Sequence, residues 1–515
     1  MKTKHVLKAA CVLLLALPGH AQQIVCERLL TTPGLEVRSP TACAAPNGEF
    51  IVTGAARPIG TTTPTLATHT LVARLQAISC DTLWTRRLPH SVPYYNASSV
   101  RANAQTIWLL TPDTVSNITN APPFKGVRLW QLTSSGQIQK LVRPTARSVR
   151  EYLVNLLEIN DGGVFVQLQN EAAAGGSFTG GILRYNNAGT LRWRRDYGLA
   201  ANNRASGLCY TPTGHVLVAG TVGVGANYDA HAKLLEVETN RGDSLRGTTL
   251  PWGPNVTYEF VNSRNEQPLE TIALRDGGGY VLPSLVGTPA FRQTGQLTRL
   301  DANYNVLWRY QLPTLPTPNA YNVFQQVREL ADGTLLALVG SRDMQRTFWL
   351  YRFRASTGAL LASYAFTPTT PAIVVGVAQL LPVAADSTLL VVGGSRPSST
   401  LTQVGGIYVA RLRVPGLPRV VTPALPLAVR AGSAAGLVLG LYPNPARDAV
   451  TIELPARPAT GQLELRDALG RLVRTQPVGA GPQVVRWPLA GLAPGLYAVL
   501  LRGPGGSGVR RLVVE

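Results

Sequence analysis

Hydrophobic and polar residues alternate with a period of two over many short segments of this chain. Between residues 156 and 197, apolar runs at 164–168 and 181–185 are separated by turns at 161–163 and 187–189. Runs of this kind, bounded by Asp, Asn and Gly, are typical of antiparallel strands joined by tight turns. The pattern predicts a small four-stranded sheet with one apolar face that another copy must cover.

The first turn of this unit recurs along the chain. Seven repeats of four strands are typical of a β-propeller, in which radially stacked blades cover one another. We predict an all-β fold with a seven-bladed β-propeller. Six or eight blades are alternatives, because the second copy is degenerate and a strand near residues 24–30 could complete the last blade. The turns begin, 52 to 63 residues apart, at Asn47, Asn103, Asp161, Thr213, Asp276, Asp332 and Asp386.

A tryptophan recurs at the start of the fourth strand, at Trp84, Trp193 and Trp308. Tryptophan rings can stack on sugars, but a residue at the same place in several repeats is expected to pack between neighbouring blades. We therefore interpret these side chains as structural contacts rather than as a binding platform.

The N-terminus has a different pattern. Three lysines precede the apolar run of residues 11–17, which is followed by small residues suited to cleavage. This arrangement predicts a secretory signal peptide over residues 1–21, so the mature chain would begin near Gln22. The apolar run is too short to cross a bilayer, and no later segment is long and apolar enough to do so. We expect no transmembrane segment.

The net charge limits the classes of partner that we expect, and the cysteine content limits the possible metal sites and disulfides. The net charge is +20, but the basic residues are spread along the chain, so we expect a solvated basic surface and no nucleic-acid binding. An alternative role for the positive charge is attraction to anionic polysaccharide on the cell surface. Cys26, Cys43, Cys80 and Cys209 follow the signal peptide, and their spacing matches neither a zinc site nor a known disulfide framework. We expect the four cysteines to be buried in strands. They leave room for one disulfide, and the sequence does not indicate which two cysteines form it.

The strand pattern stops after residue 414. Residues 415–438 contain four prolines with several Ala and Gly, which predicts an extended linker between a propeller at 22–414 and a new domain. Residues 439–515 again show short alternating strands joined by turns. Their number and length predict a small Ig-like β-sandwich.

Residues 439–515 contain four sequence landmarks, at 442–448, 470–471, 491–497 and 511–514. Together they resemble the type A C-terminal sorting domain of the type IX secretion system of some Gram-negative bacteria. The resemblance implies export by the signal peptide, recognition by the type IX machinery, and cleavage in or near the linker. The product would be released or attached to surface lipopolysaccharide. An ordinary Ig-like accessory module is the alternative. The motif residues are Tyr442, Pro443, Asn444, Pro445, Asp448, Gly470, Arg471, Gly491, Pro494, Gly495, Tyr497, Arg511, Leu512, Val513 and Val514.

Motifs for catalysis or cofactor binding are missing from the sequence. It contains no metalloprotease helix, nucleophile elbow, phosphate-binding loop or repeated Asp-box. Residues 301–305 copy the first half of a calcium loop, but Val306 and Leu312 stand where that loop needs Gly and Glu. We predict no catalytic, cofactor-binding or metal-binding residues and no cofactor. Whether the protein is an enzyme stays open, with a non-catalytic role favoured.

These observations favour a monomeric, secreted or surface-attached protein that reaches the outside through the periplasm. We favour a non-catalytic binding module whose partners, besides the secretion machinery, are surface polysaccharide or other proteins. One alternative is a secreted polysaccharide-degrading enzyme with carboxylates drawn from several blades. Another is a structural or adhesive surface protein. Tyr94, Tyr95 and the loops 172–180 and 221–230 are candidate elements of a binding face.

Overall fold

The computed structural model describes most of the 515-residue chain, as a series of separate segments. The predicted signal peptide, Tyr94, Tyr95, Gly470 and most of the linker lie outside these segments. The described residues are 23–59, 67–92, 99–103, 105–114, 124–144, 150–159, 161–171, 178–197, 204–224, 229–254, 256–260, 270–275, 278–287, 293–313, 322–341, 346–370, 373–383, 387–397, 405–421, 439–454, 460–467, 471–481, 483–503 and 506–515.

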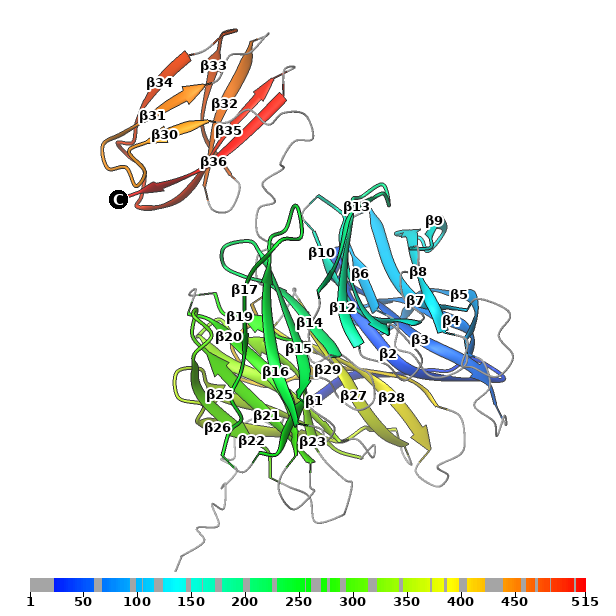
Figure 1. Ribbon diagram of the computed structural model, residues 1–515. Coiled ribbons are helices and arrows are strands. Elements are labelled where there is room, and N and C mark those ends of the chain that lie inside the picture. Colours follow the sequence, from blue (N-terminus) through cyan, green and yellow to red (C-terminus); the bar gives the residue numbers. More distant parts are fainter. Residues whose placement is uncertain are drawn as a thin grey trace, which may run out of the picture.

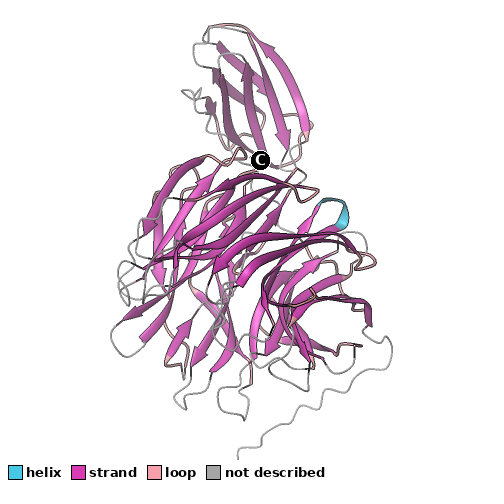
Figure 2. Cartoon of the chain, turned by 90° about the vertical axis from the view of Figure 1, so that its right-hand side faces the viewer, coloured by secondary structure: helices cyan, strands magenta, loops and turns pink. Residues whose placement is uncertain are grey.

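The described chain is all-β, as the sequence predicts. One short 3-10 turn, η1 (Pro46–Gly48), interrupts the strands (Figure 2). Within the described residues, β1 to β29 form seven small antiparallel sheets, six with four strands and one with five. The first four sheets contain β2 (Leu35–Ala45), β3 (Glu49–Pro58), β4 (Ala67–Gln76) and β5 (Thr82–Val92); β6 (Ser99–Ala102), β7 (Thr106–Thr114), β8 (Phe124–Thr133) and β9 (Ile138–Val142); β10 (Arg150–Glu158), β11 (Val164–Glu171), β12 (Phe178–Tyr185) and β13 (Leu191–Tyr197); and β14 (Arg204–Tyr210), β15 (Val216–Val224), β16 (Asp229–Val237) and β17 (Ser244–Thr249).

The last sheet joins the two ends of this region. Its outermost strand is the N-terminal β1, which pairs with β29, so the expectation that residues 24–30 complete the last repeat is confirmed (Figure 1). The remaining three sheets contain β18 (Tyr258–Phe260), β19 (Ile272–Ala273), β20 (Tyr280–Gly287), β21 (Gln293–Leu300) and β22 (Val306–Gln311); β23 (Asn322–Glu329), β24 (Thr334–Ser341), β25 (Phe348–Arg354) and β26 (Leu360–Phe366); and β27 (Ile373–Pro382), β28 (Leu389–Pro397), β29 (Gly406–Arg413) and β1 (Gln23–Leu30).

The first strands of neighbouring sheets contact one another in sequence. β2 contacts β6, β6 contacts β10, β10 contacts β14, and β27 contacts both β23 and β2. This succession, which returns from the last sheet to the first, is a propeller-like arrangement. We call the first strands of the sheets the inner strands.

Each hydrophobic core cluster is shared by two neighbouring sheets. One cluster joins Trp108 and Leu129 of the second sheet to Val166 and Leu183 of the third, and all four side chains are buried. Burying one such side chain contributes about 1.5–3 kcal/mol relative to exposure. An isolated sheet would leave this face in water, which is why the repeats must pack against one another.

The recurring tryptophans reach from one sheet to the next, as expected for structural residues. The indole N–H groups of Trp84, Trp193 and Trp308 donate to the carbonyl oxygens of Ser134, Thr239 and Ala355 at 3.3, 3.3 and 2.8 Å. Each acceptor lies in the turn between the third and fourth strands of the next sheet. We call this arrangement the inter-sheet lock.

A glycine in the receiving turn makes room for each ring. At Gly358, for example, φ is +71° and a Cβ added to this residue would lie 2.7 Å from the Trp308 ring. Gly136 and Gly242 receive Trp84 and Trp193 in the same way. The position therefore requires both a left-handed backbone and the absence of a side chain.

A disulfide replaces the inter-sheet lock where the last sheet meets the first. Cys26 lies opposite Arg411 on the neighbouring strand, as Trp84 lies opposite Arg74. Cys80, with φ of +60°, occupies the place of the glycine in the receiving turn. Cys26 and Cys80 are bonded, with Cα atoms 6.1 Å apart. The one bridge for which the sequence left room thus closes the seam between β1 and the first sheet.

Two polar contacts support the same seam. Arg28 pairs with Asp81 at 3.5 Å, and Arg411 Nη1 donates to the carbonyl oxygen of Ile78 at 2.6 Å. Cys43, on β2 of the first sheet, and Cys209, on β14 of the fourth, are buried free thiols, as predicted. Burial raises the pKa of the Cys43 thiol to about 12, so it stays protonated and unreactive at neutral pH.

Residues 415–421, which we expected to begin the linker, lie against the large domain. Leu417 and Val420 are buried in a core cluster with residues of the last two sheets, and Val420 forms a β-bridge with Leu330. The prolines of this segment break the strand pattern in the sequence, but its apolar side chains still pack.

The C-terminal residues, orange to red in Figure 1, form two further sheets. One has the order β30-β31-β34 and the other β33-β32-β35-β36, and their buried side chains share one core around Trp487 and Val499. These strands are β30 (Gly440–Tyr442), β31 (Ala449–Leu454), β32 (Gly461–Asp467), β33 (Leu472–Val478), β34 (Gln483–Pro488), β35 (Gly495–Gly503) and β36 (Gly506–Val514).

Candidate functional site

The first predicted landmark of the C-terminal region binds the last one. Asn444 lies in the loop between β30 and β31, and its amide spans two positions of the terminal strand β36. Its Nδ2 donates to the carbonyl oxygen of Arg511 at 2.7 Å, and its Oδ1 accepts from the N–H of Val513 at 2.8 Å. Both bonds copy the backbone pattern of a neighbouring strand. Asn444 therefore serves as an additional partner for the outer edge of β36.

The backbone beside Asn444 continues this contact. Ala446 forms a parallel bridge with Val514, and its N–H donates to the carbonyl oxygen of Val513 at 2.8 Å. Pro443 and Pro445 on either side cannot donate backbone hydrogen bonds. The carbonyl oxygen of Asp448 accepts from the N–H of Leu489 at 2.8 Å, which ties the end of the loop to the segment after β34.

The other two landmarks meet at the same end of the sheet. In the pairing of β35 with β36, Gly495 lies opposite Val514 and Tyr497 opposite Leu512. Tyr497 also lies opposite Asp467 of β32, whose carboxylate accepts from Nε of Arg471 at 2.6 Å. Gly491, with φ of +83°, and Pro494 form the turn before β35. Four landmarks that are far apart in the sequence therefore converge around the start of β35 and the end of β36.

Several side chains at this end are exposed. The exposed side chains are Tyr442, Arg471, Leu496 and Arg511, whereas those of Leu512 and Val514 are buried. Buried apolar residues of the motif thus hold the terminal strand, and the exposed side chains of the landmarks, two basic, one aromatic and one aliphatic, face solvent. We call these four exposed side chains the sorting surface.

In the large domain, charged side chains gather on the inner strands. Glu270, just before β19, accepts from Nη2 of Arg328 at 2.9 Å and from Nε2 of Gln326 at 2.7 Å, both on β23. Burial acts to raise the pKa of Glu270, but the charges of Arg328 and Arg101 outweigh it and hold the pKa below its usual value. Glu270 is therefore an ionised, paired carboxylate at neutral pH.

The pKa of a second carboxylate is shifted in the opposite direction. Glu158 ends β10, and burial raises its pKa, although Arg101 and a hydrogen bond with Asn103 partly oppose this effect. Arg101 lies on β6, where its guanidinium is 3.5 Å from Oδ1 of Asn155. Arg101 acts on both Glu158 and Glu270, so side chains from several sheets share one electrostatic environment.

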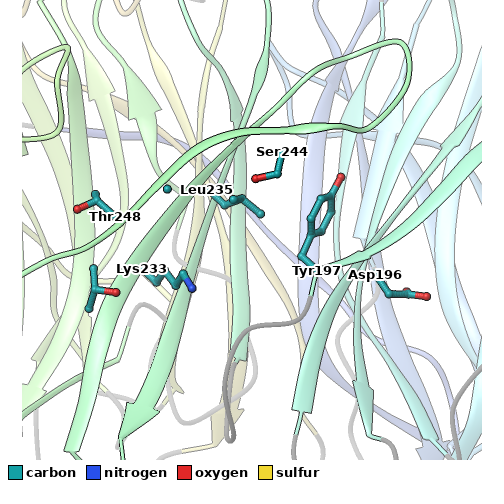
Figure 3. Close-up of a pocket in the computed structure, with 8 residues that line it drawn as sticks. Asp196, Tyr197, Lys233, Leu235, Ser244 and Thr248 are labelled. Carbon is teal, nitrogen blue, oxygen red and sulfur yellow. The ribbon is translucent and has the colours of Figure 1, made fainter.

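A pocket of about 540 Å³ lies between the third and fourth sheets (Figure 3). Asp196 and Tyr197, at the end of β13, form one side. Lys233 of β16 extends from the other side into the space between the strands, and the hydroxyl groups of Ser244 and Thr249 come from β17. The pocket is wide enough for a small-molecule ligand.

The sequence did not predict the residues of this pocket or the charged inner-strand residues. Lys233 and Tyr197 are 36 positions apart, on different sheets, so no local spacing relates them. A signal exists for the inner-strand residues, because Arg101 and Glu158 lie directly before the predicted turns at Asn103 and Asp161. Of the candidate face elements, parts of the loops 172–180 and 221–230 lie outside the described residues, as do Tyr94 and Tyr95.

Solved structures with a similar fold are distant in sequence. PorZ, described as an essential bacterial surface component of the type IX secretion system of Porphyromonas gingivalis, has 13% identity and a TM-score of 0.38 over 91% of this chain. The chain spans 58% of the length of PorZ. A protein of unknown function from Dyadobacter fermentans has 10% identity and a TM-score of 0.44, over 77% of this chain and 100% of that protein.

A polysaccharide lyase, described as an ulvan lyase, has 10% identity and a TM-score of 0.48, over 75% of this chain and 98% of the lyase. No curated protein sequence matches the chain. None of the helices in the described part is long and apolar enough to cross a membrane.

The C-terminal region has a specific match. Residues 440–515 match the family model described as the secretion system C-terminal sorting domain. This range contains the four landmarks and all strands of the two C-terminal sheets. The C-terminal region of this chain is therefore a type IX secretion sorting domain, and the protein is secreted or attached to the outer cell surface.

Proposed function

We propose that this protein is a type IX cargo whose large domain acts outside the cell as a non-catalytic binding module. In this proposal residues 1–21 are a signal peptide, and the seven sheets are the blades of a closed β-propeller at 22–414. The linker 415–438 stays on the propeller through residue 421, and residues 439–515 form an Ig-like sandwich. The mature protein acts as a monomer.

The observation that carries the export part of the proposal is the convergence of the four landmarks. Residues far apart in the sequence lie together at the sorting surface, where Asn444 holds the terminal strand in place. A receptor that reads this surface would read the folded domain rather than a linear peptide. Arg511 would supply positive charge for an acidic partner surface.

Pairing of the charged groups supports binding over catalysis. Glu270 is bound by Arg328 and Gln326, and its lowered pKa makes it a poor proton donor at neutral pH. General acid catalysis needs a carboxyl group with a pKa near the working pH. Such pairs are also common structural elements between repeats.

Export is tested by deleting residues 511–515 from the chain produced in a type IX-competent bacterium. We expect the deletion to leave the protein in the periplasm, because it removes the strand end that Asn444 and Ala446 bind. A Gln462→Ala variant is the control, since the side chain of Gln462 donates to Thr475 on the adjacent strand and lies outside the landmarks. Surface delivery of the deletion variant at the level of the unaltered protein would refute the proposal.

The binding role is tested with the secreted protein and a panel of polysaccharides and surface proteins. Retention without new products supports a binding module. One observation favours the second candidate, a polysaccharide-degrading enzyme: Glu158 and Glu270 have pKa values displaced in opposite directions, as acid and base pairs do. New oligosaccharides in the mass spectrum, lost in Glu158→Gln, would establish the enzyme and reject the non-catalytic role.

A further inference from the structure

The pocket between the third and fourth sheets contains the ammonium group of Lys233, which has no partner in the part of the chain that the structure describes. Within the described residues, Lys233 makes no ion pair and no side-chain hydrogen bond, although it is half-buried. Asp196, on the opposite side, is already engaged, because Nδ2 of Asn170 donates to its Oδ1 at 2.8 Å and Arg194 lies within 3.3 Å. The charge of Lys233 is therefore available to an anionic group that enters the pocket.

A buried amide without partners lies beside the pocket. Gln167 of β11 is fully buried, and neither its Nε2 nor its Oε1 has a hydrogen-bond partner among the described residues. It lines a void of about 20 Å³ whose wall also includes Tyr197 and Lys233, so the void adjoins the larger pocket. An unpaired buried amide lowers stability, and leucine would fill the same space without this penalty. The void has room for about one water molecule, which could bond the Gln167 amide and relay the contact to a ligand in the larger pocket.

The walls are fixed before any ligand arrives. The hydroxyl of Tyr197 donates to the carbonyl oxygen of Gly242 at 2.8 Å, which orients the ring at the edge of the pocket. A Cβ added to Gly181 would lie 2.8 Å from Oδ1 of Asp196 and 2.9 Å from Nδ2 of Asn170. Glycine at this position makes room for the Asp196–Asn170 pair that forms the rim. A preorganised site loses less conformational entropy when the ligand binds.

We propose that this pocket binds one acidic sugar residue of a polysaccharide. The sugar carboxylate pairs with Lys233, and its ring lies against Tyr197. Its hydroxyls bond the Ser244 and Thr249 hydroxyls directly and the Gln167 amide through one water molecule in the adjoining void. Three features favour a sugar acid over a phosphate: the single ammonium group, the lack of a bidentate guanidinium among the described lining residues, and the hydroxyl-rich rim. This inference rests on the binding role proposed above and names its ligand class.

The test uses calorimetry with the full secreted protein, trigalacturonate as the probe, and its methyl ester as a matched neutral ligand. We expect trigalacturonate to bind about tenfold more tightly than the ester, which corresponds to one ionic contact. Lys233→Gln should lose this preference. Arg192→Gln removes the same charge from an exposed position of β13 outside the pocket and should keep the preference.

Gln167→Leu separates a binding role from a structural one. Because the amide makes no hydrogen bond within the described residues, the variant should melt at the same or a higher temperature and still bind trigalacturonate several-fold more weakly. A lower melting temperature with unchanged affinity would show that Gln167 serves the fold alone and would overturn its part in the site.

Other outcomes separate this inference from the proposed function. If the protein retains a neutral polysaccharide or a surface protein, and Lys233→Gln binds trigalacturonate like the unaltered protein or neither binds it, the acidic-sugar site is wrong and the binding role stands. If the unaltered protein cleaves the trisaccharide at a rate that Lys233→Gln retains, both the non-catalytic role and the site are wrong.

Discussion

Removing the seam disulfide should cost a large share of the stability of the large domain. Cys26 and Cys80 are separated by 54 positions. In the chain-entropy model, closing a loop of this length in the unfolded state stabilises the folded state by about 4 kcal/mol. A domain typically has about 5–15 kcal/mol of stability, so the double variant Cys26→Ser, Cys80→Ser should unfold at a markedly lower denaturant concentration.

The seam should open before the rest of the ring. Without the bridge, β1 is held by its pairing with β29 and by exposed contacts such as the Arg28–Asp81 ion pair, which contributes at most about 1 kcal/mol. We expect limited proteolysis of the double variant to begin near β1, whereas the sheet of β10 to β13 stays protected.

The assay is guanidinium unfolding of the oxidised protein, the reduced protein and the double variant. Reduction should reproduce the double variant, because Cys43 and Cys209 are unbonded and unaffected by the reductant. The single variant Cys26→Ser should match both. If the double variant unfolds within about 1 kcal/mol of the oxidised protein, the chain-entropy reasoning is wrong for this seam.

Three further predictions concern other contacts. Gly358→Ala should destabilise the protein by about 1–2 kcal/mol more than Gly333→Ala, as measured by thermal melting, because both need a left-handed backbone but only the first clashes with Trp308; equal losses would count against the inter-sheet lock. Burial acts to raise the pKa of Glu236, but hydrogen bonds from Arg246, His215 and Tyr304 hold it below its usual value. Ionised Glu236 therefore stabilises the folded state fully at pH values above its unfolded pKa, near 4.3, and this stabilisation is lost as the pH falls through the folded pKa. In Glu236→Gln, the melting temperature should fall less steeply below about pH 4.5 than in the unaltered protein. Identical slopes would refute this assignment. Asn444→Ala should speed amide hydrogen exchange at the end of β36 by about five- to thirtyfold, since two exposed hydrogen bonds contribute about 1–2 kcal/mol together. Unchanged exchange would mean that the loop does not hold the strand.

Local signals in the sequence predicted the strands and their turns. A turn such as Asp161–Gly162 depends on two adjacent residues, and Gly162 adopts the left-handed conformation that the prediction requires, with φ of +79°. Period-two apolar runs likewise depend only on which face of a strand is buried. The sorting landmarks were recognised because each is a short motif, although their convergence became visible only in the pairing of β35 with β36.

Contacts between sheets could not be predicted in the same way. The partner of Cys26 depends on which strand completes the last sheet, and four cysteines gave no preference among pairings. The aligned repeats contain a hint, because Cys80 occupies the position of Gly136 and Gly358 in the receiving turns. Lys233 and Gln167 had no such hint, since the environment of each is set by a neighbouring sheet.

Closure of the ring by β1 has a consequence for the order in which the domain folds. Gln23 lies opposite Arg413, so the first strand to leave the ribosome waits for the last strand of the domain before it gains its partner. Contacts between such distant positions form slowly, because a long loop must close first. Cys26 and Cys80 both lie near the N-terminus, so their bridge can form in the oxidising periplasm once the first sheet exists. The disulfide then holds β1 beside the position of the last sheet, so that β29 pairs with β1 when the rest of that sheet forms. Assembly of the large domain would therefore proceed from the first sheet to the last.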